Sequence, residues 1–384
     1  MDLLKEELHR IVSRKIVKVS FIAVLFIQVL LFTTTGILQE RSVINGQTYT
    51  GLAAIKMDRE ITKPLEGELT WEKMEKIAAD YGFVDIDAKN FDVKSNYLNS
   101  FLYDNNLTNG YLREWEDYKQ PTELMPLKES DMGKLLADKG DVPTLAYTKG
   151  WRVFENTATM AAVLVCLWSV IALTPVFAEE YSMKTVNIVL TTVHGKKKDI
   201  LMRFAAAFLF TAGAYVLVIG VSFLLCGSFY GFGGLDALYG SMNHIWYADY
   251  GDRQSVSFFT VGQFFAIMAF VAFLGLVMLT SFVLLLSAVA RQPFTALIVS
   301  LLFYVAPLAI WLYLNMINEK STRVMMQLRR ILMCSPVYCC ISGSIADTMF
   351  PGIIWYRAGV FAVLVIPSLM FAFRCYRNHQ VDIH

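Results

Sequence analysis

Long apolar runs dominate the pattern of hydrophobic and polar positions along this chain. A hydrocarbon core of about 30 Å is crossed by roughly 20 helical residues, and six segments reach or approach that length. They lie at 19–39, 154–178, 204–227, 263–290, 293–316 and 353–373. The last carries Arg357 near one end, from where its side chain can extend to the headgroups. The pattern predicts an α-helical polytopic membrane protein with six transmembrane helices.

Basic residues in the segments between these spans indicate the orientation. With the N-terminus inside, thirteen Lys and Arg residues fall in the inner segments and five in the short outer ones. Cytoplasmic loops carry the excess of positive charge, so N-in/C-in is favoured. The four basic residues of 319–330 run against this rule, and a run 254–290 that crossed twice would place them inside. That run has no polar turn, so a single span preceded by an interfacial helix is preferred.

Residues 40–153 form a long insertion between the first two spans. Up to Gly150 it holds 20 acidic and 14 basic residues, a net charge of −6, and it has no cysteine. We expect an α or α+β extracellular domain with a small core of its own and no disulfides. The first span is longer than a cleavable signal's apolar region, so it is interpreted as a signal anchor. The domain is interpreted either as a structural spacer or as a substrate gate or docking surface.

The clearest element predicted inside this domain is a helix over 70–82. Thr70 is a suitable N-cap and Gly82 a suitable end. The apolar residues between them recur at i, i+3, i+4 and i+7, at Met74, Ile77, Ala78 and Tyr81. Further short helices are predicted at 112–118 and 130–138.

Composition and chemistry narrow the function classes. With 55% hydrophobic and 17% charged residues, a mean hydropathy of +0.46 and a net charge of +1, the chain is not disordered, collagen-like or a nucleic-acid binder. The histidines are scattered and no phosphate-binding loop is present. No ionisable residue lies near a predicted midplane, where ion-coupled carriers place them. We therefore expect no catalytic, metal or cofactor site, and energy supplied by a partner.

The six cysteines are interpreted mainly as small apolar residues in or near the spans. Cys334 is the exception, because it is spaced to pair with Cys339 or Cys340 if that loop lies outside. A single glycosylation sequon at 106–108 carries no weight in a bacterial cell.

Two inner segments have an amphipathic pattern. The stretch after Glu179 and Glu180 has apolar residues at i, i+3, i+4 and i+7, followed by a basic cluster: Val186, Val189, Leu190 and Val193, then Lys196, Lys197 and Lys198. Such a helix either enters the groove of a cytoplasmic protein or lies on the membrane surface. Residues 1–18 are similar, with Arg10, Arg14 and Lys15 available to lipid phosphates, and are predicted to form an interfacial elbow helix.

These residues resemble a known family. The segment FAEEYSMKTVNIVLTTV at 177–193, followed by KDILMR at 198–203, resembles the inner loop of type-2 ABC transporter permeases. Glu180 and Thr185 match the family's glutamate and threonine, Lys184 replaces its glycine, and His194 with Gly195 stands where a proline turn is common. Further similarity lies in LLLSAVARQPF at 284–294, in EGELTWEKM at 66–74, which is similar to permeases of Gram-positive bacteria, and in YRNHQV at 376–381.

The resemblance implies a dimer of six-span subunits, homomeric or heteromeric, in a bacterial plasma membrane. Each subunit would rest a coupling helix in segment 179–203 on a separate ATPase that binds ATP and Mg²⁺. The docking residues it implies are Glu180, Lys184, Thr185, Val186, Val189, Leu190, Val193 and His194. The residues expected at the membrane surface are Arg10, Arg14, Lys15, Lys196, Lys197 and Lys198.

Three functions follow from these features. The leading one is the permease subunit of an ABC exporter that moves a peptide, a drug-like amphiphile or a lipid-linked molecule. The second is a sensory or immunity protein that binds an extracellular peptide with residues 40–153 and signals through a partner. The third, a membrane-embedded enzyme, is disfavoured because the potential catalytic residues do not cluster.

Overall fold

The computed structural model describes most of the chain, and its architecture is that of a helical multi-pass membrane protein. The described residues are 2–87, 92–110, 120–130, 133, 142–192, 195, 197–242, 259–316, 323–342 and 353–378. Six helical stretches among them are long and apolar enough to cross a membrane, in agreement with the sequence: α2 (Lys15–Leu31) with η1 (Phe32–Ile37), α7 (Lys149–Leu173) with α8 (Pro175–Ser182), α10 (Lys198–Tyr230), α11 (Val261–Val289), α12 (Pro293–Met316) and α15 (Ile353–Arg377).

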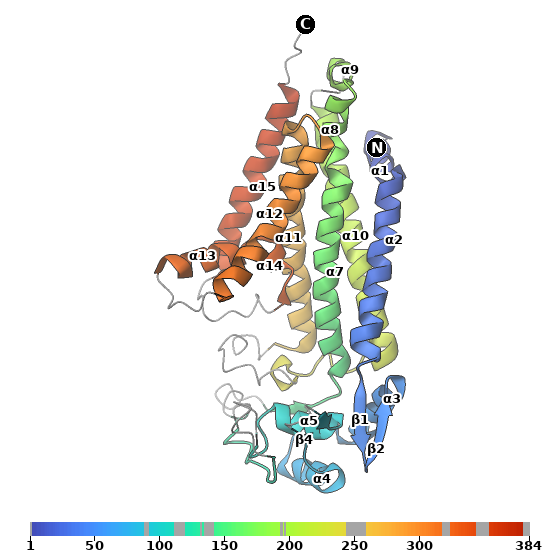
Figure 1. Cartoon of the computed structure of the whole chain (residues 1–384), viewed down its shortest axis with the longest axis vertical. Helices are drawn as coiled ribbons and strands as arrows, with labels where there is room; N and C mark the ends of the chain where they lie inside the picture. The colour runs from blue at the N-terminus through green and yellow to red at the C-terminus, as the bar shows by residue number, and fades with distance from the viewer. Residues whose placement is uncertain are drawn as a thin grey trace.

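The bundle has two distinct ends. Figure 1 places the N-terminal helix α1 (Asp2–Ser13), the short helix α9 (Val186–Thr191) and the C-terminal end of α15 at one end. The folded insertion between α2 and α7 lies at the other end (Figure 1). We call these the inner and outer ends, following the predicted orientation. Because α10 has 33 residues, it is about 50 Å long and extends beyond a hydrocarbon core of about 30 Å.

Helices α7 and α11 form the centre of the bundle. Their most apolar windows are 67% and 50% buried, against 11–22% for the other four spans. Small residues allow close approach here, including Ala161, Ala162 and Ala272. Residues 261–289 form one helix without a turn, which is the arrangement of a single span and not of the double crossing considered above. That helix begins after its N-cap Thr260, whose hydroxyl accepts a hydrogen bond from Gln263 N at 3.2 Å. Most of the stretch expected to hold the interfacial helix lies in 243–258, outside the described residues.

A break between α7 and α8 lies near the inner end. Pro175 lacks an amide hydrogen and begins a new helix at this point. Ser287 on α11 satisfies the free backbone groups: its hydroxyl donates to Thr174 O at 2.7 Å and accepts from Phe177 N at 2.9 Å. The bend is therefore fixed by a third helix and not left free.

The segment between α12 and α15 folds back into the bundle. It contains α13 (Arg323–Met333) and α14 (Pro336–Cys339). Helix α14 packs against the middle of α11 at Gly275, where an added Cβ would lie 2.7 Å from Cys339 Cβ and 2.8 Å from Pro336 O. This described part of 317–352 is thus not a loop lying wholly outside the spans.

The cysteines of this segment do not pair with one another. Cys334, Cys339 and Cys340 are all free and buried, so the pairing that their spacing left open is not formed. The Cys340 thiol lies beside that of Cys166 in α7, with 3.6 Å between the Sγ atoms. The reason is the fold of α14, which turns Cys340 toward the bundle.

The insertion is an α+β domain built from hairpins and short helices. A hairpin of β1 (Arg41–Ile44) and β2 (Gln47–Thr50) turns at Asn45 and Gly46, both with positive φ (51° and 77°), which suits a two-residue hairpin turn. Then follow α3 (Leu52–Thr62), η2 (Lys63–Leu65), β3 (Gly67–Glu68), α4 (Trp71–Tyr81), β4 (Asp85–Asp87), β5 (Asp92–Lys94), α5 (Tyr97–Asp104) and β6 (Thr144–Leu145). Strand β3 pairs with β6, and β4 with β5.

The helix predicted over 70–82 is confirmed as α4. The Thr70 hydroxyl accepts from Lys73 N at 3.3 Å, and Gly82 ends the helix with φ of 67°. Met74 and Ile77 are fully buried in the domain core with residues of α5. The helices predicted at 112–118 and 130–138 lie almost entirely outside the described residues.

Candidate functional site

A buried ion network joins four helices at the inner end of the bundle. Its centre is the Glu180 carboxylate at the end of α8, which accepts hydrogen bonds from Arg203 Nη2 at 2.7 Å and Arg10 Nη1 at 3.0 Å. The Tyr376 hydroxyl on α15 donates to the same carboxylate. Glu180 and Arg203 are only 5% and 2% exposed, so each charge depends on the other for compensation. The network therefore ties α1, α8, α10 and α15 together.

Arg203 is held on every side. It forms an ion pair with Asp199 one turn earlier, with Nε 2.9 Å from Oδ2, and Nη1 donates to Val176 O at 3.2 Å. The guanidinium carbon lies 5.4 Å and 5.5 Å from the ring centroids of Phe177 and Tyr376. Cation–π attraction adds to the ion pairs in such a desolvated place.

The elbow between α1 and α2 is clamped onto the same site. Arg14 Nη2 lies 2.5 Å from Glu179 Oε2, and Nη1 donates to Ala172 O at 3.3 Å. On α1, burial raises the pKa of the Glu7 carboxyl above its ordinary value. The positive charges of Arg203 and Arg10 oppose this shift but do not cancel it. Arg10 and Arg14 thus serve carboxylates of their own chain, and only part of each side chain is left for lipid phosphates.

The other residues predicted at the membrane surface are exposed where the structure describes them. Lys15, Lys197 and Lys198 are exposed at the inner ends of α2 and α10. Lys196 lies outside the described residues.

The short helix α9 follows directly from Glu180. The Thr185 amide donates to Glu180 O at 3.0 Å, and Lys184 between them has φ of 57°, in the left-handed region that favours glycine. Lys184 is exposed and Thr185 is half-buried. The network carboxylate and the start of α9 are therefore connected through a single tight turn.

The predicted docking face of α9 requires a correction. Val186 and Leu190 are 4% and 6% exposed and belong to the protein's own core. The apolar side chains that face outward are Met183 and Ile188, which are 63% and 67% exposed. The i, i+3, i+4 spacing identified an amphipathic helix correctly, but its apolar face is used to hold the helix on the bundle. Val189 is half-buried, and Val193 and His194 lie outside the described residues.

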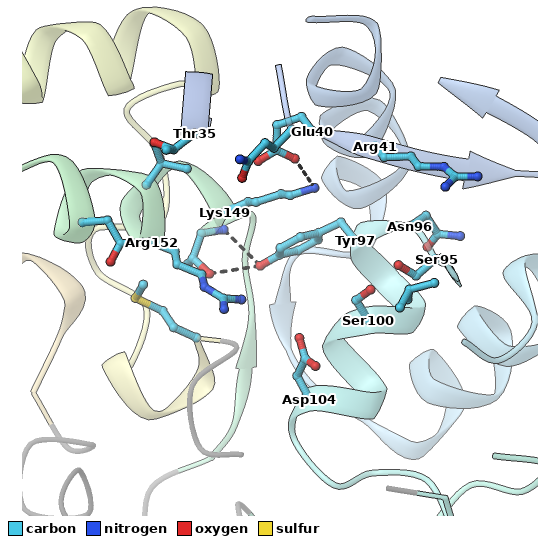
Figure 2. Close-up of a pocket in the computed structure, with 16 residues that line it drawn as sticks. Thr35, Glu40, Arg41, Ser95, Asn96, Tyr97, Ser100, Asp104, Lys149 and Arg152 are labelled. Carbon is cyan, nitrogen blue, oxygen red and sulfur yellow. Dashed lines mark hydrogen bonds and ion pairs between the residues drawn. The ribbon is translucent and has the colours of Figure 1, made fainter. Parts of the chain in front are cut away.

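A second buried network lies at the outer end, where the inserted domain (residues 40–148) meets the spans. The Lys149 ammonium at the start of α7 pairs with Glu40 Oε2 at 2.5 Å and Asp58 Oδ2 at 3.1 Å (Figure 2 draws the first pair). Asp58 on α3 is fully buried and accepts from Ser42 Oγ at 2.6 Å. The Tyr230 hydroxyl at the end of α10 donates to Glu40 Oε1 at 3.0 Å. These contacts fasten the domain to two spans, α7 and α10.

Tyr97 on α5 completes this contact. Its hydroxyl donates to Ala146 O at 2.6 Å and accepts from Thr148 N at 3.0 Å. Burial raises the pKa of Tyr97 to about 12, so the phenol stays protonated and able to donate at physiological pH. Figure 2 shows this ring beside Lys149, with a cavity between α5 and α7 next to it.

Part of these networks was predictable from sequence. Glu180, Arg10 and Arg14 were candidate residues, although their mutual contacts were not foreseen, and neither Lys149 nor Asp58 was singled out. A possible signal for Asp58 is its place on one helix face with Ala54, Ile55 and Thr62, all of them buried. In the described part of the chain, His, Cys, Asp and Glu side chains do not gather in threes as a metal site would require.

Comparison with known proteins identifies no family for this chain. No protein-family model matches this sequence, and no curated protein matches it.

Proposed function

We propose that this chain is the permease subunit of an ATP-driven ABC exporter in a bacterial plasma membrane. The observation that carries the proposal is the network around Glu180, because it lies directly behind the exposed helix α9 and is shared by four helices. A force applied to α9 would act on all four helices at once. In this proposal a separate ATPase subunit supplies that force, and the chain itself hydrolyses nothing.

The path of the force follows from the contacts. An ATPase surface would touch Met183, Lys184 and Ile188, which point outward. Val186 and Leu190 anchor α9 in the core, so the short helix moves as a unit with α8. From α8 the displacement reaches α10 through Arg203, and it reaches α11 through Ser287 at the α7–α8 break. Packed interiors transmit such displacements because they are close to incompressible.

The left-handed turn before α9 supports the same assignment. Lys184 stands where the permease family has glycine, and its φ of 57° is the conformation that glycine adopts at least cost. The lysine at this position therefore adopts a backbone conformation that a glycine would adopt readily.

The distribution of charge supports an external energy source. Every Asp, Glu, Lys and Arg in the six candidate spans lies within about two turns of a span end. Ion-coupled carriers place such groups at the midplane, where they bind the coupling ion. The proposed complex contains two ATPase subunits with ATP and Mg²⁺ and a second permease subunit, the same or different.

The test combines purification with one pair of variants on α9. The tagged chain, purified in mild detergent, is expected to bring down a stoichiometric ATPase with vanadate-sensitive turnover. Ile188→Asp should abolish that association, because it places a charge in an apolar contact, whereas the conservative Ile188→Met should retain it. An ATPase that binds both variants equally would mean that α9 is not the docking element.

A second candidate function is kept for one reason, the firm attachment of the extracellular domain through Lys149. A sensory or immunity protein that binds an extracellular peptide would use the same attachment to report binding to a signalling partner. Purification of the chain alone, or with a histidine kinase, would favour this function over transport.

A further inference from the structure

The cavity beside Tyr97 lies at the junction of the extracellular domain with the outer ends of the spans. It has a volume of about 460 Å³ and is lined by sixteen residues, of which only Val93, Val153 and Met242 are apolar. In Figure 2 side chains of α5 and α7 face each other across it. This volume lies in the range of small-molecule sites, but the lining is far more polar than is usual.

Two polar groups that line the cavity are already engaged by other residues of the chain. The Tyr97 hydroxyl is used by Ala146 and Thr148, and the Lys149 ammonium is neutralised by Glu40 and Asp58. These bonds hold the two walls in place and preserve the hollow between them.

The walls carry polar groups that remain available. The side chains of Arg152 and Asn156 on α7, Ser100 on α5 and Gln39 form no hydrogen bond or ion pair with any other residue that the structure describes. Arg152 is thus a guanidinium without an ion pair to any described residue, at the edge of a polar cavity that Asp104 also lines. Guanidinium groups bind phosphate oxygens in pairs, and neutral amides and hydroxyls complete the shell of such an anion.

The depth of Arg152 indicates where the anion comes from. Roughly 20 helical residues cross the hydrocarbon, and counting them back from Glu179 at the inner end reaches a point close to Met160. Arg152 and Asn156 therefore lie at the level of the outer headgroups. Met160, one turn deeper, is 53% exposed on the same helix face.

Over two turns this face of α7 carries the cationic Arg152, the amide Asn156 and the apolar Met160, all exposed. Most of the apolar part of the helix is otherwise buried. The sequence of groups matches an amphiphile with a phosphate headgroup and apolar chains. We infer that the cavity binds the phosphate headgroup of a lipid-like amphiphile, with Arg152 as the anion-binding residue, Asn156 and Ser100 as hydrogen-bonding partners, and the chains lying along α7 past Met160.

The inference rests on the proposed function in one respect: if the chain is an exporter subunit, the bound amphiphile is the molecule it transports. Binding itself needs no ATPase. A chain that binds the amphiphile but purifies without an ATPase would retain the site and lose the exporter proposal. A chain that purifies with an ATPase but does not bind the amphiphile would retain the exporter proposal and lose the site.

The experiment is calorimetric titration of the purified full chain in dodecyl maltoside, a detergent without phosphate. Three probes are compared: dihexanoyl phosphatidic acid, dihexanoylglycerol and inorganic phosphate. Phosphatidic acid is expected to bind, and the other two to bind at least about tenfold more weakly. Dihexanoylglycerol lacks the phosphate, and inorganic phosphate lacks the acyl chains. Equal affinity for inorganic phosphate would mean a site for a free anion, and equal affinity for dihexanoylglycerol would mean apolar adsorption; either result overturns the inference.

Variants locate the site. Arg152→Gln should weaken phosphatidic acid binding by about tenfold or more, and Asn156→Asp should weaken it through repulsion of the phosphate. Lys56→Gln is the matched control. It also removes one exposed positive charge, from α3 of the inserted domain, but Lys56 does not line this cavity. Both α7 positions are exposed, so folding is expected to be retained. An unchanged affinity in Arg152→Gln, or an equal loss in Lys56→Gln, contradicts the assignment.

Discussion

Replacing Glu180 by alanine tests whether the inner network holds the bundle together. The substitution removes the carboxylate that Arg203, Arg10 and Tyr376 share. Arg203 would then remain as a buried cation, since it is 2% exposed and held among aromatic rings. The expected consequence is a lower free energy of unfolding together with looser coupling between α9 and the spans.

The size of the effect follows from burial and from the contacts that remain. Breaking a buried ion pair by removing one partner costs about 3–5 kcal/mol. Arg203 keeps Asp199, with Nε 2.9 Å from Oδ2, and lies 3.7 Å from a Glu7 carboxylate oxygen. These two carboxylates compensate part of the charge, so we expect the lower end, about 3 kcal/mol.

The measurement is equilibrium unfolding in mixed micelles with increasing dodecyl sulfate, followed by tryptophan fluorescence. The double variant Glu180→Ala with Arg203→Met removes both charges, so it should cost less than the sum of the single variants by about 2 kcal/mol. Lys56→Ala is the control, since Lys56 and Glu60 form an exposed pair at 3.8 Å and exposed pairs contribute little.

Additive single effects, or a loss below about 1 kcal/mol for Glu180→Ala, would refute the reasoning. Either result would mean that the carboxylate is solvated like a surface group. The network would then not be able to carry displacements from α9 into the spans.

Two further predictions concern α14 and the domain inserted between α2 and α7. Gly275→Ala should push α14 off α11 and lower the yield of the Cys166–Cys340 disulfide that copper phenanthroline forms, since an added Cβ would meet backbone at 2.8 Å. Gly220→Ala, where nothing lies within 4 Å, should leave that yield unchanged. Because the pKa of Tyr97 is raised from 10.0 to about 12, its stabilising contribution is complete below pH 10 and lost as pH rises to about 12. Tyr97→Phe should lack this extra alkaline loss in a pH series of thermal unfolding, and an identical pH profile would contradict the burial argument.

Local sequence determined the elements of this protein. Apolar runs of span length predict six membrane helices because backbone groups in lipid are satisfied within a helix, and the described residues contain six helices long and apolar enough to cross a membrane. The same holds for α4, because Thr70, Gly82 and the spacing of Met74 and Ile77 act within a few residues of each other. Where the residues that determine an element lie within a turn or two of each other, the sequence is sufficient to predict that element.

The tertiary structure alone decided how these elements are used. Glu180 meets Arg10 across 170 residues and Tyr376 across 196, and no local pattern encodes such pairs. The apolar face of α9 was predictable, but its partner was not, because a core and a docking groove demand the same residue spacing. Only the packing of Val186 and Leu190 into the bundle shows that Ile188 is the exposed side chain. Burial, which converts an ordinary glutamate into the centre of a network, is a property of the whole fold.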